Sequence, residues 1–266
     1  MSTIPSQYRL HGMFGPINKT SEQTLEQAKQ KVLDEPANRF LTSTGKQIRA
    51  GLVNESYRAA GGQGQAPSQI AQAIELLHAG SLIVDDIEDD SQTRRGRPTL
   101  HREVGLPVAL NIGNWFYFRS LECLSSSPIP GRLSHAMLHR SIKTIRRCHE
   151  GQALDLGVSV QDVAVNEMYS IAREISKLKT GGLTSLAAWL GAASSGVGSV
   201  PRRALARFGM SAGNCLQMKN DLQELTNFVE GDPRCDDLRN MRITWVWAWT
   251  SKLARHSQTG ELRQRL

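Results

Sequence analysis

Cysteine is scarce in this chain of 266 residues, and its four copies lie far apart. They are Cys123, Cys148, Cys215 and Cys235, without the close pairs typical of zinc and redox sites, so we expect reduced thiols. Long apolar runs are also missing. The N-terminal stretch MSTIPSQYRLHGMFG lacks the apolar core of a secretion signal, and the longest uncharged stretch, residues 181–200, is rich in Ser, Gly and Ala. These features favour a close-packed core helix and predict a cytoplasmic protein without a membrane span.

Aromatic residues make up only 6% of the chain and do not interleave with basic tracts. Lys and Arg number 32 against 25 Asp and Glu, which gives a net charge of +7 at pH 7. Such a surplus is as typical of a solvated surface as of a site for a polyanion, whether nucleic acid, an anionic membrane or a phosphorylated small molecule. Because nucleic-acid binders combine basic stripes with aromatic residues, the sequence predicts no nucleic-acid partner.

Turn-forming residues divide the chain into helical segments. Gly, Pro and Ser cluster at residues 61–68, 94–98, 125–132, 194–201 and 229–233. The segments between these breaks show helical spacing of apolar residues, as at Ile70, Ile74, Leu77, Ser81 and Val84. No convincing strand pair is present. The pattern predicts one all-α domain over residues 1–266, in which long helices surround a central cavity.

The stretch DDIEDDSQTRRGRP, residues 85–98, places a dense acidic cluster before a dense basic one. On a helix, Asp85 and Asp89 project from the same face, with Asp86 beside them. Their mutual repulsion calls for a cation, and several carboxylates without His or Cys suit Mg²⁺. A solvated acidic helix end is the alternative. The preceding apolar run, ELLHAGSLIV, places the acids at the rim of a core and favours the metal site.

The arginines that follow suit a phosphate. A turn at Gly96 and Pro98 can fold Arg94 and Arg95 back toward the acids, and guanidinium groups bind phosphate oxygens through paired hydrogen bonds. The arginines and aspartates could instead neutralise one another. A phosphate bridged by metal would use both clusters, so we interpret the stretch as a site that holds a diphosphate between cations.

The segment ELLHAGSLIVDDIEDDSQTRRGRPTLH closely resembles the first aspartate-rich region of the trans-polyprenyl diphosphate synthases, which make farnesyl, geranylgeranyl and longer diphosphates. TGKQIRA, with Lys46 and Arg49, is similar to the family segment that grips isopentenyl diphosphate, and His78 falls where the family has a further contact. EGQALDL, with Gln152 and Asp155, resembles a cavity-lining motif of the family. The resemblance implies an isoprenoid-synthase-type helical bundle, Mg²⁺ and a homodimer.

Further landmarks follow in order, so that the resemblance spans about residues 40 to 246. Lys179 and Thr180 in KTGGL match the pair that contacts the allylic diphosphate. The second acidic motif departs from the family pattern: LQMKNDLQE keeps Gln217 and Asp221 but has Asn220 for the first acid. An amide there supplies an oxygen without its charge, so metal binding should weaken at that position.

The C-terminal region departs from the pattern as well. DDLRNMRIT has Met241 for the family's glycine and Arg242 for its lysine, and Asn114 stands where the family commonly has aspartate. Arg242 keeps the positive charge in a longer, forked side chain. Only 22 residues follow Thr244, so we expect a short C-terminal region.

The resemblance implies a role for each of these residues. The expected catalytic residues are Asp85, Asp86, Asp89, Arg94 and Lys179, and the expected metal ligands are Asp85, Asp89, Asn220 and Asp221. The expected substrate contacts are Lys46, Arg49, His78, Arg94, Arg95, Lys179, Thr180, Gln217 and Arg242. The expected substrates are isopentenyl diphosphate and an allylic diphosphate, joined after Mg²⁺-assisted ionisation.

The sequence gives less information about the length of the product and the type of enzyme. Family members limit the product with bulky side chains about one turn before the first acid. Gly80 and Ser81 are small there, which favours a product longer than farnesyl, such as geranylgeranyl diphosphate. The alternatives are a terpene cyclase or prenyltransferase of specialised metabolism, and a non-catalytic regulatory subunit. Lys46, Arg49 and Arg95 argue against a cyclase, which needs no second diphosphate.

Overall fold

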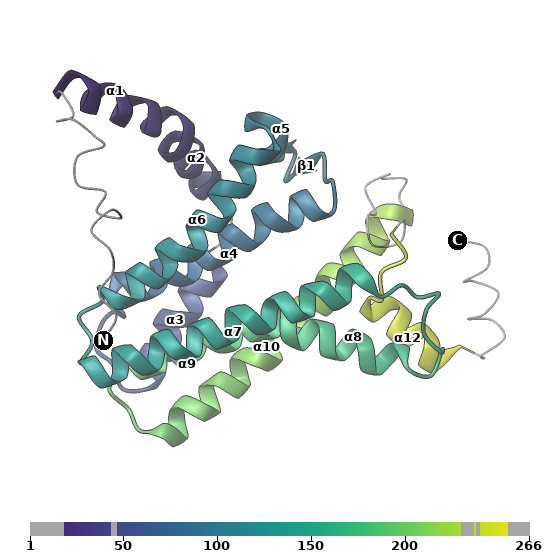
Figure 1. The fold of residues 1–266 in the computed structure, drawn as a ribbon. Helices are drawn as coiled ribbons and strands as arrows, with labels where there is room; N and C mark the ends of the chain where they lie inside the picture. The colour runs from purple at the N-terminus through teal and green to yellow at the C-terminus, as the bar shows by residue number, and fades with distance from the viewer. Residues whose placement is uncertain (1–18, 44–46, 230–236, 238–239, 255–266) are drawn as a thin grey trace, which may run out of the picture. The chain divides into compact units, whose positions relative to one another are not determined.

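The computed structural model describes residues 19–43, 47–229, 237 and 240–254 (Figure 1). By its contacts the chain divides into two units, residues 1–43 and 44–266. The first unit contains α1 (Lys19–Lys29), the π-helical turn η2 (Gln30–Asp34) and α2 (Glu35–Ser43), which follow one another without a break. The prediction of a single domain over residues 1–266 stays a prediction.

The second unit is helical, which confirms the predicted all-α class. Its helices are α3 (Ile48–Ala59), α4 (Ser68–Glu88), α5 (Leu100–Val104), α6 (Leu106–Ser125), α7 (Gly131–Gly157), α8 (Met168–Ser176), η3 (Lys177–Gly181), α9 (Gly182–Ser194), α10 (Ser199–Val229) and α12 (Trp245–Leu253). The predicted breaks fall between α3 and α4, α6 and α7, and α9 and α10, and at the end of α10. Within the described residues no helix has the length and apolar character of a membrane span.

A short strand pair, which the sequence did not predict, follows α4. β1 (Thr93–Arg94) pairs antiparallel with β2 (Arg97–Pro98). The two residues of its turn, Arg95 and Gly96, have φ angles of 53° and 77°, as a tight hairpin turn with the twist of the strands requires. The strands are two residues long, too short to show alternation in the sequence.

Helix α9 lies in the core of the second unit. It packs against α3, α7 and α10, and every side chain from Leu183 to Ala193 is buried. Within the uncharged stretch at residues 181–200, α9 therefore forms the predicted close-packed core helix, while residues 195–198 connect it to α10. Small residues allow this approach: a β-carbon on Gly191 would overlap the backbone carbonyl of Val53 in α3.

Replacing Gly191 by alanine is expected to destabilise the fold. The added methyl group meets backbone atoms that cannot turn aside, so the two helices must separate, at a cost of about 1–3 kcal/mol or more. Gly51→Ala in α3 is the matched control, since its β-carbon meets nothing within 4 Å and it should gain up to about 1 kcal/mol of stability. Urea denaturation measures both, and an unchanged midpoint for Gly191→Ala would contradict the close contact.

Helices α4 and α6 lie side by side (Figure 1) and meet at a pair of glycines. A β-carbon on Gly80 would lie 2.8 Å from the carbonyl oxygen of Gly113. Gly80 therefore faces α6 and serves helix packing, which corrects the interpretation of Gly80 as a residue that keeps a tunnel open. Its neighbour Ser81 does line the cavity described next.

Candidate active site

One cavity of about 640 Å³ in the second unit collects nearly all the predicted site residues. Its lining includes Arg49, His78, Asp85, Asp86, Asp89, Arg94, Arg95, Lys179, Thr180, Gln217, Asn220 and Arg242. These residues come from helices α3, α4 and α10, from the η3 turn, from the end of α4 and the hairpin that follows it, and from the segment before α12. Lys46 lies outside the described residues. Asp221 does not line this cavity but lines a smaller one of about 50 Å³, which shares Lys179 and Gln217 with it. Motifs that lie far apart along the sequence thus meet in one cavity.

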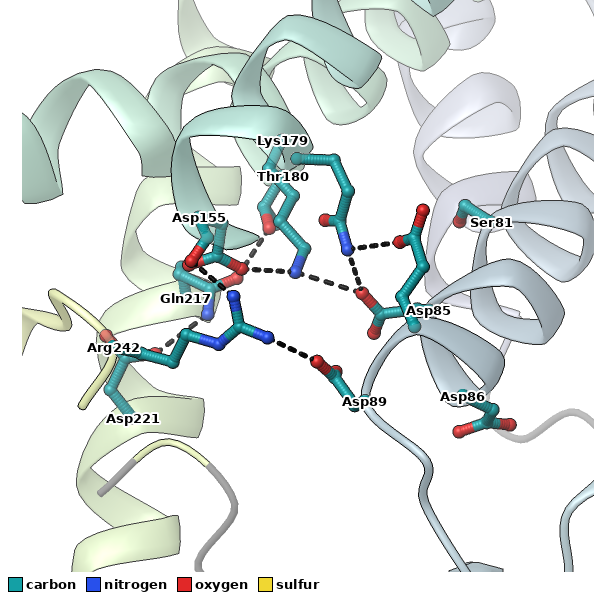
Figure 2. A network of polar contacts seen from close by, with 12 residues as sticks. Ser81, Asp85, Asp86, Asp89, Asp155, Lys179, Thr180, Gln217, Asp221 and Arg242 are labelled. Atoms are coloured by element: carbon teal, nitrogen blue, oxygen red, sulfur yellow. Dashed lines mark hydrogen bonds and ion pairs between the residues drawn. The ribbon is translucent and has the colours of Figure 1, made fainter. Parts of the chain in front are cut away.

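The acidic cluster lies at the C-terminal end of α4. Asp85 and Asp86 occupy its last turn and Asp89 is its cap residue. Carboxylates at this end of a helix oppose the helix dipole and repel one another. They are ionised at neutral pH only if cations lie close by, and Figure 2 shows cations from other elements around them.

Asp85 is held between α7 and η3. Lys179 Nζ lies 3.0 Å from Asp85 Oδ1, and Gln152 Nε2 donates a hydrogen bond of 2.8 Å to the same oxygen. Burial opposes the ionisation of Asp85, but the charges of Lys179 and Arg94 and the hydrogen bonds from Lys179 and Gln152 together outweigh burial and lower the pKa of Asp85. Gln152 also donates to Glu88 Oε2 at 2.7 Å, a contact that the sequence did not indicate.

Lys179 stands in a π-helical turn that joins α8 to α9. Besides Asp85, its ammonium group contacts Asp155 Oδ2 at 2.7 Å. Burial favours the neutral amine, but Asp85 and Asp155 outweigh burial and raise the pKa of Lys179, so it stays charged. The next residue, Thr180, donates a hydrogen bond of 2.5 Å to Gln217 Oε1. Both side chains line the cavity.

Asp86 pairs with Arg94, which also lies 4.0 Å from Asp85 Oδ2. Arg94 Nε lies 2.9 and 2.8 Å from the two oxygens of Asp86, and Arg94 Nη2 is 2.7 Å from Oδ1. Asp86 is only 2% exposed and points away from Lys179 (Figure 2). The hairpin turn does fold Arg94 back, as predicted, but its guanidinium neutralises Asp86. Arg95, the turn residue, lines the cavity.

Asp89 pairs with Arg242. Arg242 Nη2 donates to Asp89 Oδ1 at 2.7 Å, and Nη1 donates to the carbonyl oxygen of Asp155 (Figure 2). The backbone fixes this arginine as well, because Arg242 N donates to Asp237 O at 2.8 Å and Met241 has a φ of 53°. Burial and the nearby Asp85 raise the pKa of Asp89 to about 6, so the two cations near it do not fully compensate its charge.

The second acidic motif holds the C-terminal segment. Asp221 is 4% exposed and accepts hydrogen bonds of 2.8 Å from Gln217 Nε2 and from the backbone N–H of Trp245, the first residue of α12. Glu224 Oε1 accepts from Asp237 N at 2.9 Å. One oxygen of Asp221 thus caps α12 and the other accepts from Gln217 within α10, and the expected metal role of Asp221 stays a prediction.

A basic group lies between α3 and α4. Arg49 Nη1 is 2.8 Å from His78 Nε2, and Arg49 Nε is buried without a hydrogen-bond partner. Burial and then the charge of Arg49 hold the pKa of His78 well below its usual value, so the imidazole is neutral and accepts the bond. A buried donor without a partner costs free energy, which an anion such as a diphosphate would recover.

Comparison with known proteins agrees with this geometry. A profile of the family described as polyprenyl synthetase matches residues 30–266. The chain belongs to the polyprenyl synthetase family. It is 29% identical over 237 residues to the short chain isoprenyl diphosphate synthase of Methanothermobacter thermautotrophicus, with 86% of this chain and 72% of the relative covered.

Two further relatives are archaeal. The geranylgeranyl pyrophosphate synthase of Geoglobus acetivorans is 28% identical, with 79% of this chain and 65% of the relative covered. The crystal structure of geranylgeranyl pyrophosphate synthetase from Pyrococcus horikoshii superposes with a TM-score of 0.74 at 28% identity and covers 90% of this chain and 74% of that one. The chain thus spans about two thirds to three quarters of the length of these relatives. The comparisons indicate a trans-prenyltransferase and do not favour the cyclase or the regulatory subunit.

The oxygen atoms that line the cavity show where a divalent cation would fit. Among the described residues no three His, Cys, Asp or Glu side chains form a ready metal site. On the α4 side, Asp85 and Asp89 offer hard carboxylate oxygens to one cavity, and the raised pKa of Asp89 shows charge that a cation would compensate. These residues fit Mg²⁺. On the α10 side, Asn220 is neutral and Asp221 is occupied by Trp245 and Gln217, so the fit is poor.

Proposed function

We propose that the protein condenses an allylic diphosphate with isopentenyl diphosphate to form a longer trans-prenyl diphosphate. The observation that carries this proposal is the single cavity of about 640 Å³, in which two cationic groups lie apart. Lys179 and Arg242 flank the α4 carboxylates, and Arg49 with His78 forms the second group. Such a cavity suits two diphosphates whose hydrocarbon parts meet between them.

The allylic diphosphate would bind at the α4 carboxylates. Asp85 and Asp89 would hold Mg²⁺, which when bound supplies Lewis-acid stabilisation of the leaving diphosphate. Lys179 would turn from Asp85 to a diphosphate oxygen, and Arg242 would donate from N–H groups that Asp89 and Asp155 do not use. Both would stabilise the charge that develops on the diphosphate. The carbon–oxygen bond of the allylic ester breaks, its electron pair leaves with the diphosphate, and an allylic cation remains.

Isopentenyl diphosphate would bind at Arg49, His78 and Arg95, with Lys46 as the fourth predicted contact. His78 is neutral and its bond orients Arg49, whose Nε can donate to a diphosphate oxygen. The double bond of isopentenyl diphosphate attacks the allylic cation and forms the new carbon–carbon bond. The proton then lost goes to the departing diphosphate, so no Ser or Cys nucleophile is required.

We propose a product longer than farnesyl diphosphate, such as geranylgeranyl diphosphate. Ser81 lines the cavity one turn before Asp85 and has little bulk, which leaves room for a longer chain. Relatives named as geranylgeranyl and geranylfarnesyl diphosphate synthases, at 28–31% identity, support this range of lengths.

A homodimer is also proposed. Helix α6 exposes Leu106, Leu110 and Phe118, which are 52%, 38% and 72% accessible, and an apolar row of this kind suits a partner surface. Light scattering on the purified protein tests it, with a mass of two chains expected. The cytoplasmic location stays a prediction.

Incubation with Mg²⁺, labelled isopentenyl diphosphate and dimethylallyl, geranyl or farnesyl diphosphate tests the function. We expect label in longer prenyl diphosphates and loss of incorporation when EDTA removes the metal. Cyclic hydrocarbon from the allylic substrate alone would instead indicate a cyclase. No product from any allylic substrate would indicate a non-catalytic subunit.

A further inference from the structure

The carboxylates of α10 are committed to the fold. Asp221 caps α12 through Trp245 N and accepts from Gln217, and Glu224 accepts from Asp237 N. Two members of the motif line the cavity: Asn220, which is an exposed neutral amide, and Glu224, one of whose oxygens accepts from Asp237 N. An amide oxygen alone is a weak ligand for a divalent cation. On α10 the first acidic position of the motif is therefore neutral, and the two carboxylates of the motif already hold the C-terminal segment.

A fixed cation already lies on that side of the cavity. Arg242 is 8% exposed, and its guanidinium spans the distance between Asp89 Oδ1 and the carbonyl oxygen of Asp155. A metal ion placed between Asp89 and α10 would meet this positive charge and would have to displace it. Two of the five N–H donors of the guanidinium serve Asp89 and Asp155, and a diphosphate can accept from others.

We propose that Arg242 takes the place of a metal ion on the α10 side, so that α4 alone supplies carboxylate ligands to the metal and Arg242 holds the diphosphate from the opposite side. The inference rests on the proposed diphosphate site. In this chain the carboxylates of the second acidic motif then hold the C-terminal segment in place. Arg242 touches the diphosphate in this account, and Asp221 and Glu224 are positioning residues.

Binding of Mn²⁺ and inorganic diphosphate to the purified protein tests this. Equilibrium dialysis gives the number of Mn²⁺ ions bound at saturating inorganic diphosphate, and calorimetry gives the diphosphate Kd at saturating Mn²⁺. Asn220→Ala should leave the number of bound Mn²⁺ ions unchanged. Arg242→Gln should also leave that number unchanged, but it should weaken diphosphate binding about tenfold or more through the loss of charge-assisted hydrogen bonds.

Two variants make the Arg242 result specific. Arg203→Gln removes the same charge from an exposed position on α10 outside the cavity and should change the diphosphate Kd less than about twofold. Arg242→Lys keeps the charge but loses the fork, so it should recover part of the affinity lost in Arg242→Gln. Far-UV circular dichroism checks that each variant is folded.

Loss of one Mn²⁺ ion in Asn220→Ala would overturn the proposal, because α10 would then supply a metal ligand. An unchanged diphosphate Kd in Arg242→Gln would overturn it as well. These outcomes are distinct from a failure of the proposed function, since a protein that binds Mn²⁺ and diphosphate as expected but turns over no substrate would refute the activity and leave the binding inference intact.

Discussion

Replacing Asp85 by asparagine is expected to lower kcat for prenyl transfer by at least about 10²–10³-fold. The change removes a carboxylate ligand from the α4 side and leaves Lys179 without one of its two acidic partners. The amide can also direct its N–H₂ group toward the Lys179 ammonium, where no acceptor remains. Steady-state kinetics with saturating Mg²⁺ and both diphosphates measures the effect, and a binding assay with Mn²⁺ shows whether metal affinity falls in parallel.

Asp90→Asn is the matched control for that experiment. Asp90 belongs to the same acidic run, but its side chain is 79% exposed, it contacts Arg102 at 2.6 Å and it does not line the cavity. Its φ of 49° is one that asparagine also adopts. A surface pair contributes little, so kcat should change less than about twofold. Equal losses in both variants, or retained turnover in Asp85→Asn, would contradict the assignment.

Replacing Ser81 by phenylalanine is expected to shift the product from geranylgeranyl toward farnesyl diphosphate, by about tenfold or more in the product ratio. Ser81 lines the cavity one turn below Asp85, and its hydroxyl donates to His78 O at 2.8 Å, so the side chain does not contribute to the metal site. A phenyl ring there fills space that the growing chain needs for a further condensation. Chromatography of the products after dephosphorylation measures the ratio.

Gly80→Ala provides the contrast for the Ser81 variant. Gly80 faces α6 and lies outside the cavity lining, so its methyl group should press on Gly113 O and destabilise the fold by about 1–3 kcal/mol. The length of the product should stay the same. If Gly80→Ala shortened the product and Ser81→Phe did not, the tunnel would run along a different face of α4 from the one inferred.

Local patterns predicted the helices well. Turn residues mark the helix ends because Gly and Pro disfavour the helix wherever they occur, and the predicted breaks at 125–132 and 194–201 match the ends of α6 and α9. The break between α7 and α8, at residues 158–167, was not predicted because it contains neither Pro nor Gly. The acidic cluster at the end of α4 was found from spacing alone.

Contacts between residues that are far apart in the sequence could not be predicted. Arg242 and Asp89 are 153 positions apart, and Gln152 and Asp85 are 67 apart, so no local pattern joins them. The role of Asp221 as the cap of α12 was missed for the same reason, because the capped residue is 24 positions away. Gly80 was misinterpreted because sequence spacing gives the distance along a helix, while its orientation depends on where α6 packs.

Which cation pairs with which carboxylate also depends on the three-dimensional structure. The sequence left open whether the arginines and aspartates neutralise one another or hold a ligand. Arg94 neutralises the buried Asp86, and Lys179 and Arg242 contact carboxylates at the cavity wall. The structure therefore pairs all three cations with aspartates, and the binding of a diphosphate by Lys179 and Arg242 stays a proposal.

Anomalous scattering from Mn²⁺ in crystals soaked with an unreactive allylic diphosphate analogue tests the central claim most directly. The account predicts Mn²⁺ bound to oxygens of Asp85 and Asp89 and to the diphosphate, with Lys179 Nζ moved from Asp85 to a diphosphate oxygen. A diphosphate bound elsewhere, with no Mn²⁺ at Asp85 and the pair Lys179–Asp85 intact, would contradict it.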